Sequence, residues 1–213
     1  CCLARSCSIR GRDGNDPVRA TLPGVRVNGT WYRSIRPAAE GAAVEVIDQT
    51  LLPHRFEITR LVSLDEVVQA IVRMQVRGAP LIGATAAYGL CLALEADPSD
   101  ASLRLAVDRL AATRPTAVNL RWALRRVEAS VVGLPAAERA AAAWEAAARI
   151  CDDDMALCRR IGEHGLVLLR KAAERKGGGP VNVLTHCNAG WLATVDGGTA
   201  LAPVYLAHDG GIA

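Results

Sequence analysis

Residues 181–190, with the sequence VNVLTHCNAG, constrain the fold of this chain more than any other stretch. Residues 177–180 (GGGP) come just before them and would end a preceding helix. The apolar beginning of the stretch is typical of a buried strand, and the small residues of segment 189–202 can begin a helix. We therefore predict a strand, a tight turn and a helix in succession. Because such units build a parallel sheet covered by helices, this prediction places the chain in the α/β class.

The predicted turn carries three side chains that can do chemistry: His186, Cys187 and Asn188. The unpaired backbone N–H groups at a helix N-terminus carry partial positive charge, so they would lower the pKa of the Cys187 thiol and offer a docking point to a phosphate. The alternative is that Cys187 only fills space, as buried cysteines often do. An apolar strand end does not need His186 and Asn188 for packing, and their presence favours Cys187 as a candidate catalytic residue.

The composition is that of an ordinary globular protein and excludes several classes. Of the 213 residues, 51% are hydrophobic and 22% charged, and no apolar run reaches the roughly 18 residues of a membrane span. The net charge is only +3, basic and acidic side chains are interleaved, and aromatic residues make up 4%. We therefore expect neither nucleic acid nor a membrane as a partner, and basic side chains that serve salt bridges or a small anionic ligand.

The seven cysteines indicate a reducing compartment, because their odd number and scattered spacing fit neither a disulfide framework nor paired zinc ligands. We expect a cytoplasmic protein. Cys1, Cys2 and Cys7 resemble half a metal site, but no second Cys/His pair follows soon after them, so we expect no metal and no other cofactor. Residues 1–24 mix Arg, Gly, Asp and Pro without a period and predict a disordered arm or a non-native extension.

Residues 25–134 predict a small antiparallel sheet followed by a bundle of helices. Short alternating runs open this part, and Asn28 with Gly29 at the first junction is a hairpin signal. Ser63 and Glu66 form a capping box, which starts a helix that should reach about Val76. Apolar periodicity and breaker residues predict further helices at residues 81–95, 101–113 and 118–132.

The rest of the chain is interpreted as two parts. Residues 135–176 are Ala-rich over a length too great for one ordinary helix, and Gly162 and Gly165 predict a break or kink among these connecting helices. Residues 177–213 begin an alternation of strand and helix, with residues 203–207 as the start of a second strand. A single strand-helix unit cannot bury both faces of a parallel sheet, so we interpret residues 177–213 as the start of a truncated domain.

Two further segments place an arginine at the start of a helix. Arg77 precedes Gly78, Ala79 and a proline, a geometry suited to gripping a phosphate with the guanidinium and backbone N–H groups together. Arg114 precedes a proline-initiated helix in the same way, with Asn119 on its first turn. The alternatives are that Arg77 caps the preceding helix and that Arg114 is an exposed arginine near an N-cap threonine.

The Cys187 turn, the two arginine segments and two further motifs together resemble the methylthioribose-1-phosphate isomerases, a family of aldose-ketose isomerases related to the exchange-factor subunits of translation initiation. The resemblance covers roughly residues 25–213. Its motifs follow in order at residues 46–50, 76–83, 114–120, 161–165 and 184–190.

The resemblance implies a fold, an assembly and a set of site residues. The N-terminal sheet and helices would be followed by a Rossmann-like parallel α/β domain, incomplete here, with the site in the cleft between them. The partners would be a small phosphorylated sugar and, for the full-length protein, a second copy of the chain in a homodimer. Carried over from the family's motifs, the substrate-binding residues are Arg77, Gly78, Ala79 and Arg114, and the catalytic residue is Cys187.

The resemblance also implies a reaction, the conversion of 5-methylthioribose 1-phosphate to 5-methylthioribulose 1-phosphate in methionine salvage. The anomeric oxygen of this sugar is esterified, so an acid must protonate the ring oxygen while C1 and C2 exchange a hydrogen equivalent, and two poised groups are needed. One would be Cys187. The family's second group is an aspartate of an Asp-Asn motif beyond the end of this sequence, and neither Asp196 nor Asp209 lies in such a motif. We therefore expect this form to bind substrate poorly and to turn it over slowly or not at all.

Two alternatives stay open. A ribose-1,5-bisphosphate isomerase would need a second anion site for the 5-phosphate, which the sequence does not reveal. A non-catalytic regulatory subunit would use the same fold as an interaction module, but it has no physical need for the cysteine and both arginines together. Outside these motifs the sequence favours core positions for two cysteines and packed or surface roles for three histidines: Cys151, Cys158, His54, His164 and His208.

Overall fold

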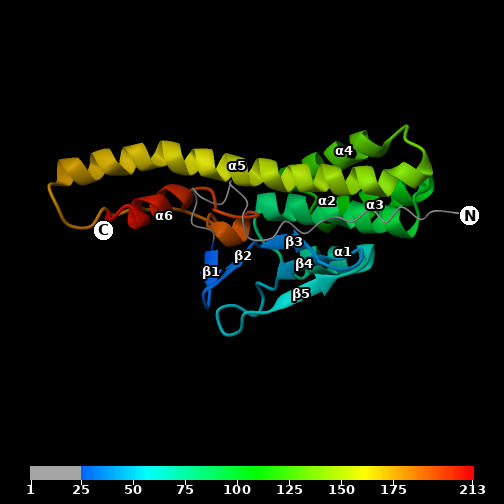
Figure 1. Cartoon of the computed structure of the whole chain (residues 1–213), viewed down its shortest axis with the longest axis horizontal. Coiled ribbons are helices and arrows are strands. Elements are labelled where there is room, and N and C mark those ends of the chain that lie inside the picture. Colours follow the sequence, from blue (N-terminus) through cyan, green and yellow to red (C-terminus); the bar gives the residue numbers. More distant parts are fainter. Residues whose placement is uncertain (1–24) are drawn as a thin grey trace, which may run out of the picture.

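The computed structural model describes residues 25–213, and one long helix runs along most of the molecule. Figure 1 shows this helix, α5 (Ala136–Lys176), with the small sheets and the other large helices near its first half and α6 (Ala202–Asp209) against its second half. The predictions for residues 1–24, including those on Cys1, Cys2 and Cys7, lie outside the described residues.

Two small antiparallel sheets form the N-terminal part, as the alternating runs predicted. Strands β1 (Val25–Val27) and β2 (Thr30–Tyr32) form a hairpin whose turn residues Asn28 and Gly29 have φ of 50° and 81°. Positive φ at both central positions matches the twist of the two strands, so the hairpin signal is confirmed. A second sheet has the order β3-β4-β5, with β3 at Ile35–Pro37, β4 at Val44–Ile47 and β5 at Ile58–Leu61.

Helix α1 (Leu64–Val72) begins where the capping box predicted. The Ser63 Oγ accepts the N–H of Glu66 at 3.3 Å, which satisfies one of the unpaired donors of the first turn. The helix ends earlier than the predicted Val76. Met74 has a left-handed φ of 62°, which the right-handed helical backbone cannot include.

Helix α2 (Ala79–Ala96) is the centre of the core. It packs against α1, α3 (Asp100–Thr113), α4 (Val118–Val131) and α5, and every residue from 81 to 94 is buried. Its length and hydropathy would suit a membrane span, but 78% of it is buried inside the fold, as in the core helix of a globular protein. The three predicted helices of this bundle are thereby confirmed, with bounds shifted by one or two residues.

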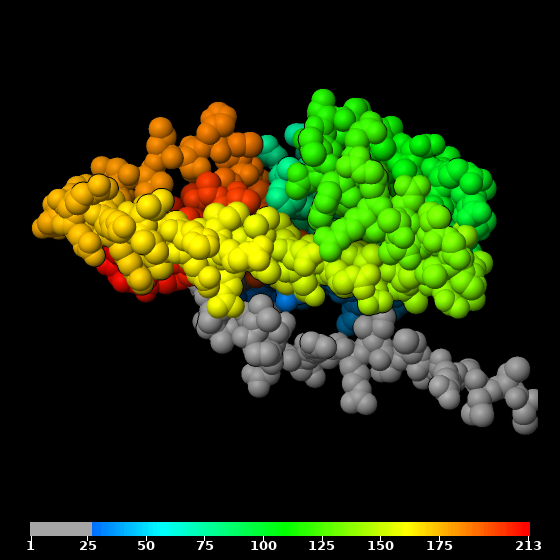
Figure 2. Space-filling view, turned by 90° about the horizontal axis from the view of Figure 1, so that it is seen from above, coloured from blue at the N-terminus to red at the C-terminus, as the bar shows by residue number. Residues whose placement is uncertain are grey.

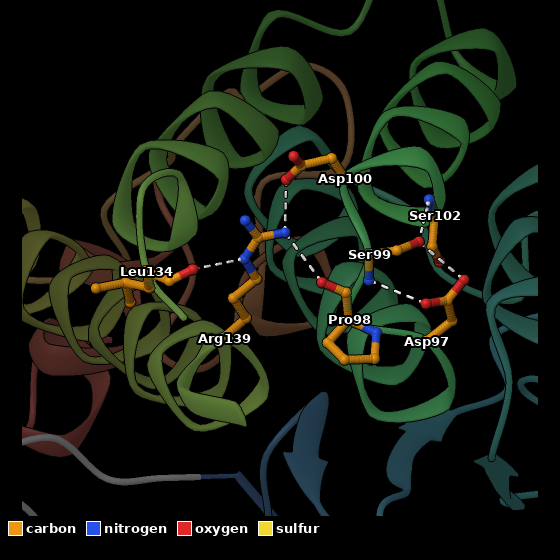
Figure 3. Close-up of polar contacts among 7 residues, drawn as sticks. All are labelled: Asp97, Pro98, Ser99, Asp100, Ser102, Leu134 and Arg139. Carbon is orange, nitrogen blue, oxygen red and sulfur yellow. Dashed lines mark hydrogen bonds and ion pairs between the residues drawn. The ribbon is translucent and has the colours of Figure 1, made fainter. Parts of the chain in front are cut away.

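The connection between α2 and α3 is fastened to the beginning of α5 (Figure 3). The Arg139 guanidinium donates to the carbonyls of Pro98 and Leu134, both at 3.0 Å, and pairs with Asp100 at 2.6 Å. Only 12% of the Arg139 side chain is exposed, so its charge has lost most of its hydration. These acceptors compensate for that loss. Since the connection is short, α3 runs back along α2 and ends near the beginning of α2.

Helix α5 is continuous, so the predicted break at its glycines is wrong. Both glycines face α6: a Cβ on Gly162 would lie 2.9 Å from Leu206 Cδ1, and one on Gly165 would lie 2.3 Å from Pro203 Cγ. These distances are shorter than van der Waals contact, so the glycines are needed where two helices touch rather than where one helix bends. Gly177 does act as expected, since its left-handed φ of 67° ends the helix.

The strand predicted at residues 181–190 is not formed. Leu184 is 98% exposed, and the backbone of residues 181–188 is held by one bond, from the Val181 N–H to the Ala213 carbonyl at 2.7 Å. A strand needs a neighbour for its N–H and C=O groups, and none of the described strands lies beside this segment. The described residues therefore contain helices and two small sheets of an α/β fold, without the parallel sheet.

The other two predictions for this part are also corrected. Residues 203–207 lie in α6 instead of a second strand, with Pro203 in the first turn, where proline is favoured in a helix. The helix expected within segment 189–202 is reduced to one 3-10 turn, η2 (Trp191–Ala193). Two glycines with positive φ follow η2 and prevent a longer helix, Gly197 and Gly198 at 80° and 74°.

Candidate functional site

The Arg77 segment lies where the sequence predicted, at the beginning of α2. Gly78 directly precedes the helix with φ 92° and ψ 139°, and Pro80 occupies the first turn. Arg77 itself is exposed. The N–H groups of a first helical turn have no partner within the helix, so an exposed guanidinium beside them completes a suitable site for an anion.

A compact segment, which we call the 189–199 loop, packs directly on Gly78. A Cβ on Gly78 would lie 2.4 Å from Ala193 Cα and 2.6 Å from the Ala193 carbonyl oxygen, so the two backbones touch. Cys187 lies two residues before the beginning of this loop. The contact between Ala193 and Gly78 therefore ties the segment of Cys187 to the Arg77 turn.

Side chains from three other parts of the fold hold the backbone of the 189–199 loop. One precedes β3, one follows β4 and one lies on α5. Each bond goes to a main-chain group, so the bonds fix the path of the loop whatever side chains the loop carries. They run from Ser34 Oγ to the Trp191 carbonyl (3.0 Å), from Gln49 Nε2 to the Leu192 carbonyl (2.7 Å), and from the Val195 N–H to Asp154 Oδ2 (2.8 Å).

Asp48 connects this support to the Arg77 segment. Its carboxylate accepts the N–H and the hydroxyl of Thr50 at 2.9 and 2.6 Å and the side-chain amide of Gln75 at 2.6 Å. Burial by itself raises the pKa of Asp48, but these hydrogen bonds outweigh it and hold the pKa below its ordinary value. The Gln49 N–H donates to the Gln75 carbonyl at 2.9 Å. The turn at residues 48–50 is therefore fastened two residues before Arg77.

Asp154 places a partly buried acid behind the 189–199 loop. Burial raises the pKa of its carboxyl from 3.8 to about 6. The hydrogen bond from the Val195 N–H works against this shift, and the nearby charge of Asp196 adds to it. At neutral pH the carboxyl is thus charged at a free-energy cost to the folded state.

We expect Asp154→Asn to stabilise the fold at neutral pH. The folded protein binds the Asp154 proton more tightly than the unfolded chain does. The ionised group therefore lowers the stability of the fold above its folded pKa of about 6, and this loss of stability disappears as the pH falls below 3.8. A shift of this size corresponds to about 2 to 3 kcal/mol near pH 8. Asparagine keeps an oxygen that can accept the Val195 N–H. Urea unfolding measures the effect. The variant should gain a large free energy of unfolding over the wild type at about pH 8 and almost none at about pH 4.

The matched control is Asp152→Asn, at an exposed position on the same helix. It should change the free energy of unfolding by less than about 0.5 kcal/mol at either pH. Destabilisation by Asp154→Asn at pH 8 would show instead that the charge of the carboxylate is needed to hold the loop.

The Arg114 segment lies beside the second turn of α2. Arg114 follows the last residue of α3, and its carbonyl accepts the Ala117 N–H at 2.9 Å in the turn before α4. A Cβ on Gly83 would lie 2.9 Å from the Asn119 carbonyl oxygen, so the first turn of α4 touches α2 there. The turns that carry Arg77 and Arg114 therefore both adjoin the N-terminal half of α2.

Cys187 is exposed, as are His186 and Asn188, and it has a left-handed φ of 69°. The helix expected directly after it is absent, because the next α-helix is α6, so the helix-dipole argument for a reactive thiol does not apply. Within residues 25–213 no hydrogen bond or ion pair joins Cys187 to Arg77 or Arg114. The structure brings together the two arginine turns and the loop that follows Cys187, and leaves the thiol itself on the surface.

The surface is hollowed between the parts that carry these residues. Figure 2 shows an indentation between the orange atoms of the segment around residue 187 and the green atoms of the helices that follow α2. A separate cavity of about 120 Å³ between α5 and α6 is lined by Leu169, Val183 and Val204 among others, with no arginine or lysine. That cavity therefore has no guanidinium or ammonium group with which to bind an anion.

Several residues of this region were not singled out from the sequence. Gln49 lies within the motif at residues 46–50 but has no role assigned, and the residues at positions 34, 75 and 154 show no sequence signal at all. The predicted core positions of Cys151 and Cys158 are confirmed, with 5% and 0% exposed. The three unassigned histidines lie at the surface: His54, His164 and His208.

Comparison with known proteins gives a family and close relatives. Residues 75–211 match the family described as "Initiation factor 2 subunit family". Two relatives have the name methylthioribose-1-phosphate isomerase. The one from Methylorubrum populi is 61% identical over 188 residues, which are 88% of this chain and 51% of the relative. The one from Rhodospirillum rubrum is 56% identical over 193 residues, which cover 88% of this chain and 50% of the relative. The chain spans about half the length of the curated relatives it matches.

Two solved structures share the fold. The crystal structure of 5-methylthioribose 1-phosphate isomerase from Pyrococcus horikoshii has a TM-score of 0.71 and 36% identity, covering 85% of this chain and 51% of that one. The structure of translation initiation factor eIF-2B, subunit delta, from A. fulgidus has a TM-score of 0.71 and 35% identity, with 85% and 52% covered. The resemblance predicted from the sequence motifs is confirmed.

Proposed function

Because the chain belongs to the initiation factor 2 subunit family, we propose that the protein isomerises 5-methylthioribose 1-phosphate to 5-methylthioribulose 1-phosphate. The observation that carries the proposal is the 61% identity, over 88% of the chain, to a relative named for this activity. The contact of the 189–199 loop with Gly78 supports this proposal. Residues that bind a phosphate and a group that reacts with the same substrate must lie at a fixed separation. The reaction class is an intramolecular oxidoreduction.

Each proposed site residue has a role in this reaction. The Arg77 guanidinium and the N–H groups of Gly78 and Ala79 bind the 1-phosphate, and Arg114 adds a second charge to the grip. Cys187 moves protons at the carbons that exchange a hydrogen equivalent. The second acid is an aspartate from the part of the full-length protein that these residues do not include.

The same proposal covers the arrangement of the full-length protein. Residues 25–134 form its N-terminal domain, residues 135–176 its connecting helix, and residues 177–213 the start of a Rossmann-like domain. We place this protein in the cytoplasm, as a homodimer that acts in methionine salvage.

Turnover of two sugars tests the proposal. The 213-residue chain and a version extended to the length of the relatives are each assayed with 5-methylthioribose 1-phosphate and with ribose 1,5-bisphosphate. We expect the extended protein to isomerise the methylthio sugar and the short chain to be at least about 100-fold slower, because it lacks one of two proton-transfer groups. A preference for the bisphosphate would replace the proposal with the alternative substrate, and equal rates for the two lengths would show that the second acid is misplaced.

A second candidate is an interaction module without catalysis, which the 35% identity to the eIF-2B delta subunit structure favours. Turnover of neither sugar by the extended protein would support this candidate. The two arginine turns would then serve as an anion-binding surface for a partner protein.

A further inference from the structure

The 189–199 loop is held more firmly than an irregular segment on a surface usually is. Three side chains from separate elements bond its main chain, and the Ser34 N–H also donates to the Val195 carbonyl at 3.0 Å. Because these groups are partly buried, water does not readily replace the bonds when they break. The fold thus fixes the position of this loop relative to α2, which is what a loop adjoining a site requires.

Gln49 differs from the other two supports because it also bonds the Arg77 segment. Its side chain donates to the Leu192 carbonyl at 2.7 Å, and its main-chain N–H donates to the Gln75 carbonyl at 2.9 Å. Gln75 is held in turn by Asp48 at 2.6 Å. One residue therefore links the backbone two positions before Arg77 to the loop that follows Cys187.

Burial makes this link stiff. Gln49 is only 9% exposed, so water has little access to replace a broken bond to the Leu192 carbonyl. Leu192 cannot shift alone, because its neighbour Ala193 already touches Gly78. The side-chain amide of Gln49 therefore acts as a spacer of fixed length between the two segments.

We propose that Gln49 is a positioning residue, which sets the separation between the phosphate grip at Arg77 and the thiol of Cys187. This inference rests on the proposed function. Gln49 acts through the 189–199 loop and need not touch the sugar. A residue of this kind lowers the barrier by keeping the reacting group aligned with a bound substrate, so its loss should reduce kcat more than it raises KM.

The test uses Gln49→Glu, which keeps the size of the side chain but points an oxygen at the Leu192 carbonyl, and Gln49→Met, which removes the donor without adding a charge. The matched control is Gln69→Glu, the same change at an exposed position on α1. Circular dichroism shows which variants are folded. In the extended protein we expect both Gln49 variants to lose about 10-fold in kcat with KM within about threefold, and the control to keep both values.

A distance measurement in the 213-residue chain gives a readout that does not depend on turnover. Spin labels are placed on Cys187, which is exposed, and on Arg104→Cys, at an exposed position on α3, with Cys1, Cys2 and Cys7 replaced by serine. Since α2 alone is about 27 Å long, the two labels are far enough apart for dipolar spectroscopy. We expect the distance distribution to broaden or shift in both Gln49 variants and to stay unchanged in Gln69→Glu.

The two readouts separate the possible failures. An unchanged distribution in both Gln49 variants overturns the inference, and so does a changed distribution with normal kcat in a protein that isomerises the sugar. If the wild-type extended protein turns over neither sugar, the proposed function fails, while a changed distribution still supports the placement of Cys187 by Gln49.

Discussion

Replacing Cys187 by alanine in the extended protein is expected to lower kcat for 5-methylthioribose 1-phosphate at least about 100-fold. The expectation rests on the proposed function, in which the thiol moves protons at the reacting carbons. Serine should fail as well, because a hydroxyl ionises much less readily than a thiol. KM should change by less than about threefold, since the phosphate is held by Arg77 and Arg114. Steady-state kinetics of the three proteins, side by side, are the measurement.

The same variants separate chemistry from folding. The Cys187 side chain is exposed, so alanine and serine should leave the free energy of unfolding within about 0.5 kcal/mol of the wild type. Alanine and serine both have a Cβ, as cysteine does. The left-handed φ of 69° therefore destabilises the fold equally with any of the three residues. Normal turnover by the alanine variant would remove Cys187 from the mechanism, whereas a large loss of stability would show that the residue has a structural role.

The parts of the fold that follow from local chemistry could be predicted from the sequence. Asn28 and Gly29 form a hairpin turn because both tolerate positive φ, and Ser63 caps α1 because its hydroxyl reaches a first-turn N–H. The Arg77 turn begins α2 for a similar reason, since glycine followed by a proline in the first turn suits a helix start. These signals involve residues that are close in sequence and need no knowledge of the tertiary structure.

The errors arise where one local signal has two physical causes. In the sequence Gly162 and Gly165 predict a break or kink, but a helical glycine also permits close approach of a second helix, and only the position of α6 decides between the two. The apolar run at residues 181–190 has the composition of a strand, but a strand exists only beside a partner, and the described residues provide none.

The candidate site was predictable in its parts and not in its assembly. The sequence placed Arg77 and Arg114 at helix starts. Arg77 is found there, directly before the N-cap of α2, but Arg114 is the C-cap of α3, and α4 begins only at Val118. The supports of the 189–199 loop could not be found, because Gln49 and Asp154 bond main-chain groups that lie 143 and 41 residues away. When a side chain bonds a backbone group, its partner can be a residue of almost any type. The sequence therefore does not mark where that partner is.

Replacing Gly78 by alanine is expected to have the largest effect on stability of the changes considered, a loss of about 3 kcal/mol or more in the free energy of unfolding. Two costs add: the φ of 92° with ψ of 139° is a conformation that residues with a Cβ rarely adopt, and the new Cβ would lie 2.4 Å from Ala193 Cα. Because the obstacle is backbone, it cannot rotate away, and the 189–199 loop must shift. Urea unfolding measures the loss, and hydrogen exchange at Val195 should report the displaced loop.

The control for the positive φ is Gly29→Ala. Gly29 also has a positive φ, 81°, but nothing lies within 4 Å of the position its Cβ would take. It should therefore cost only the conformational part, about 1 kcal/mol. The difference between the two variants contains the contact between Gly78 and the loop together with the extra conformational cost of the ψ of 139° at Gly78. Equal losses would mean that this contact is easily relieved, and the loop would then not be the element that fixes Cys187 relative to the Arg77 turn.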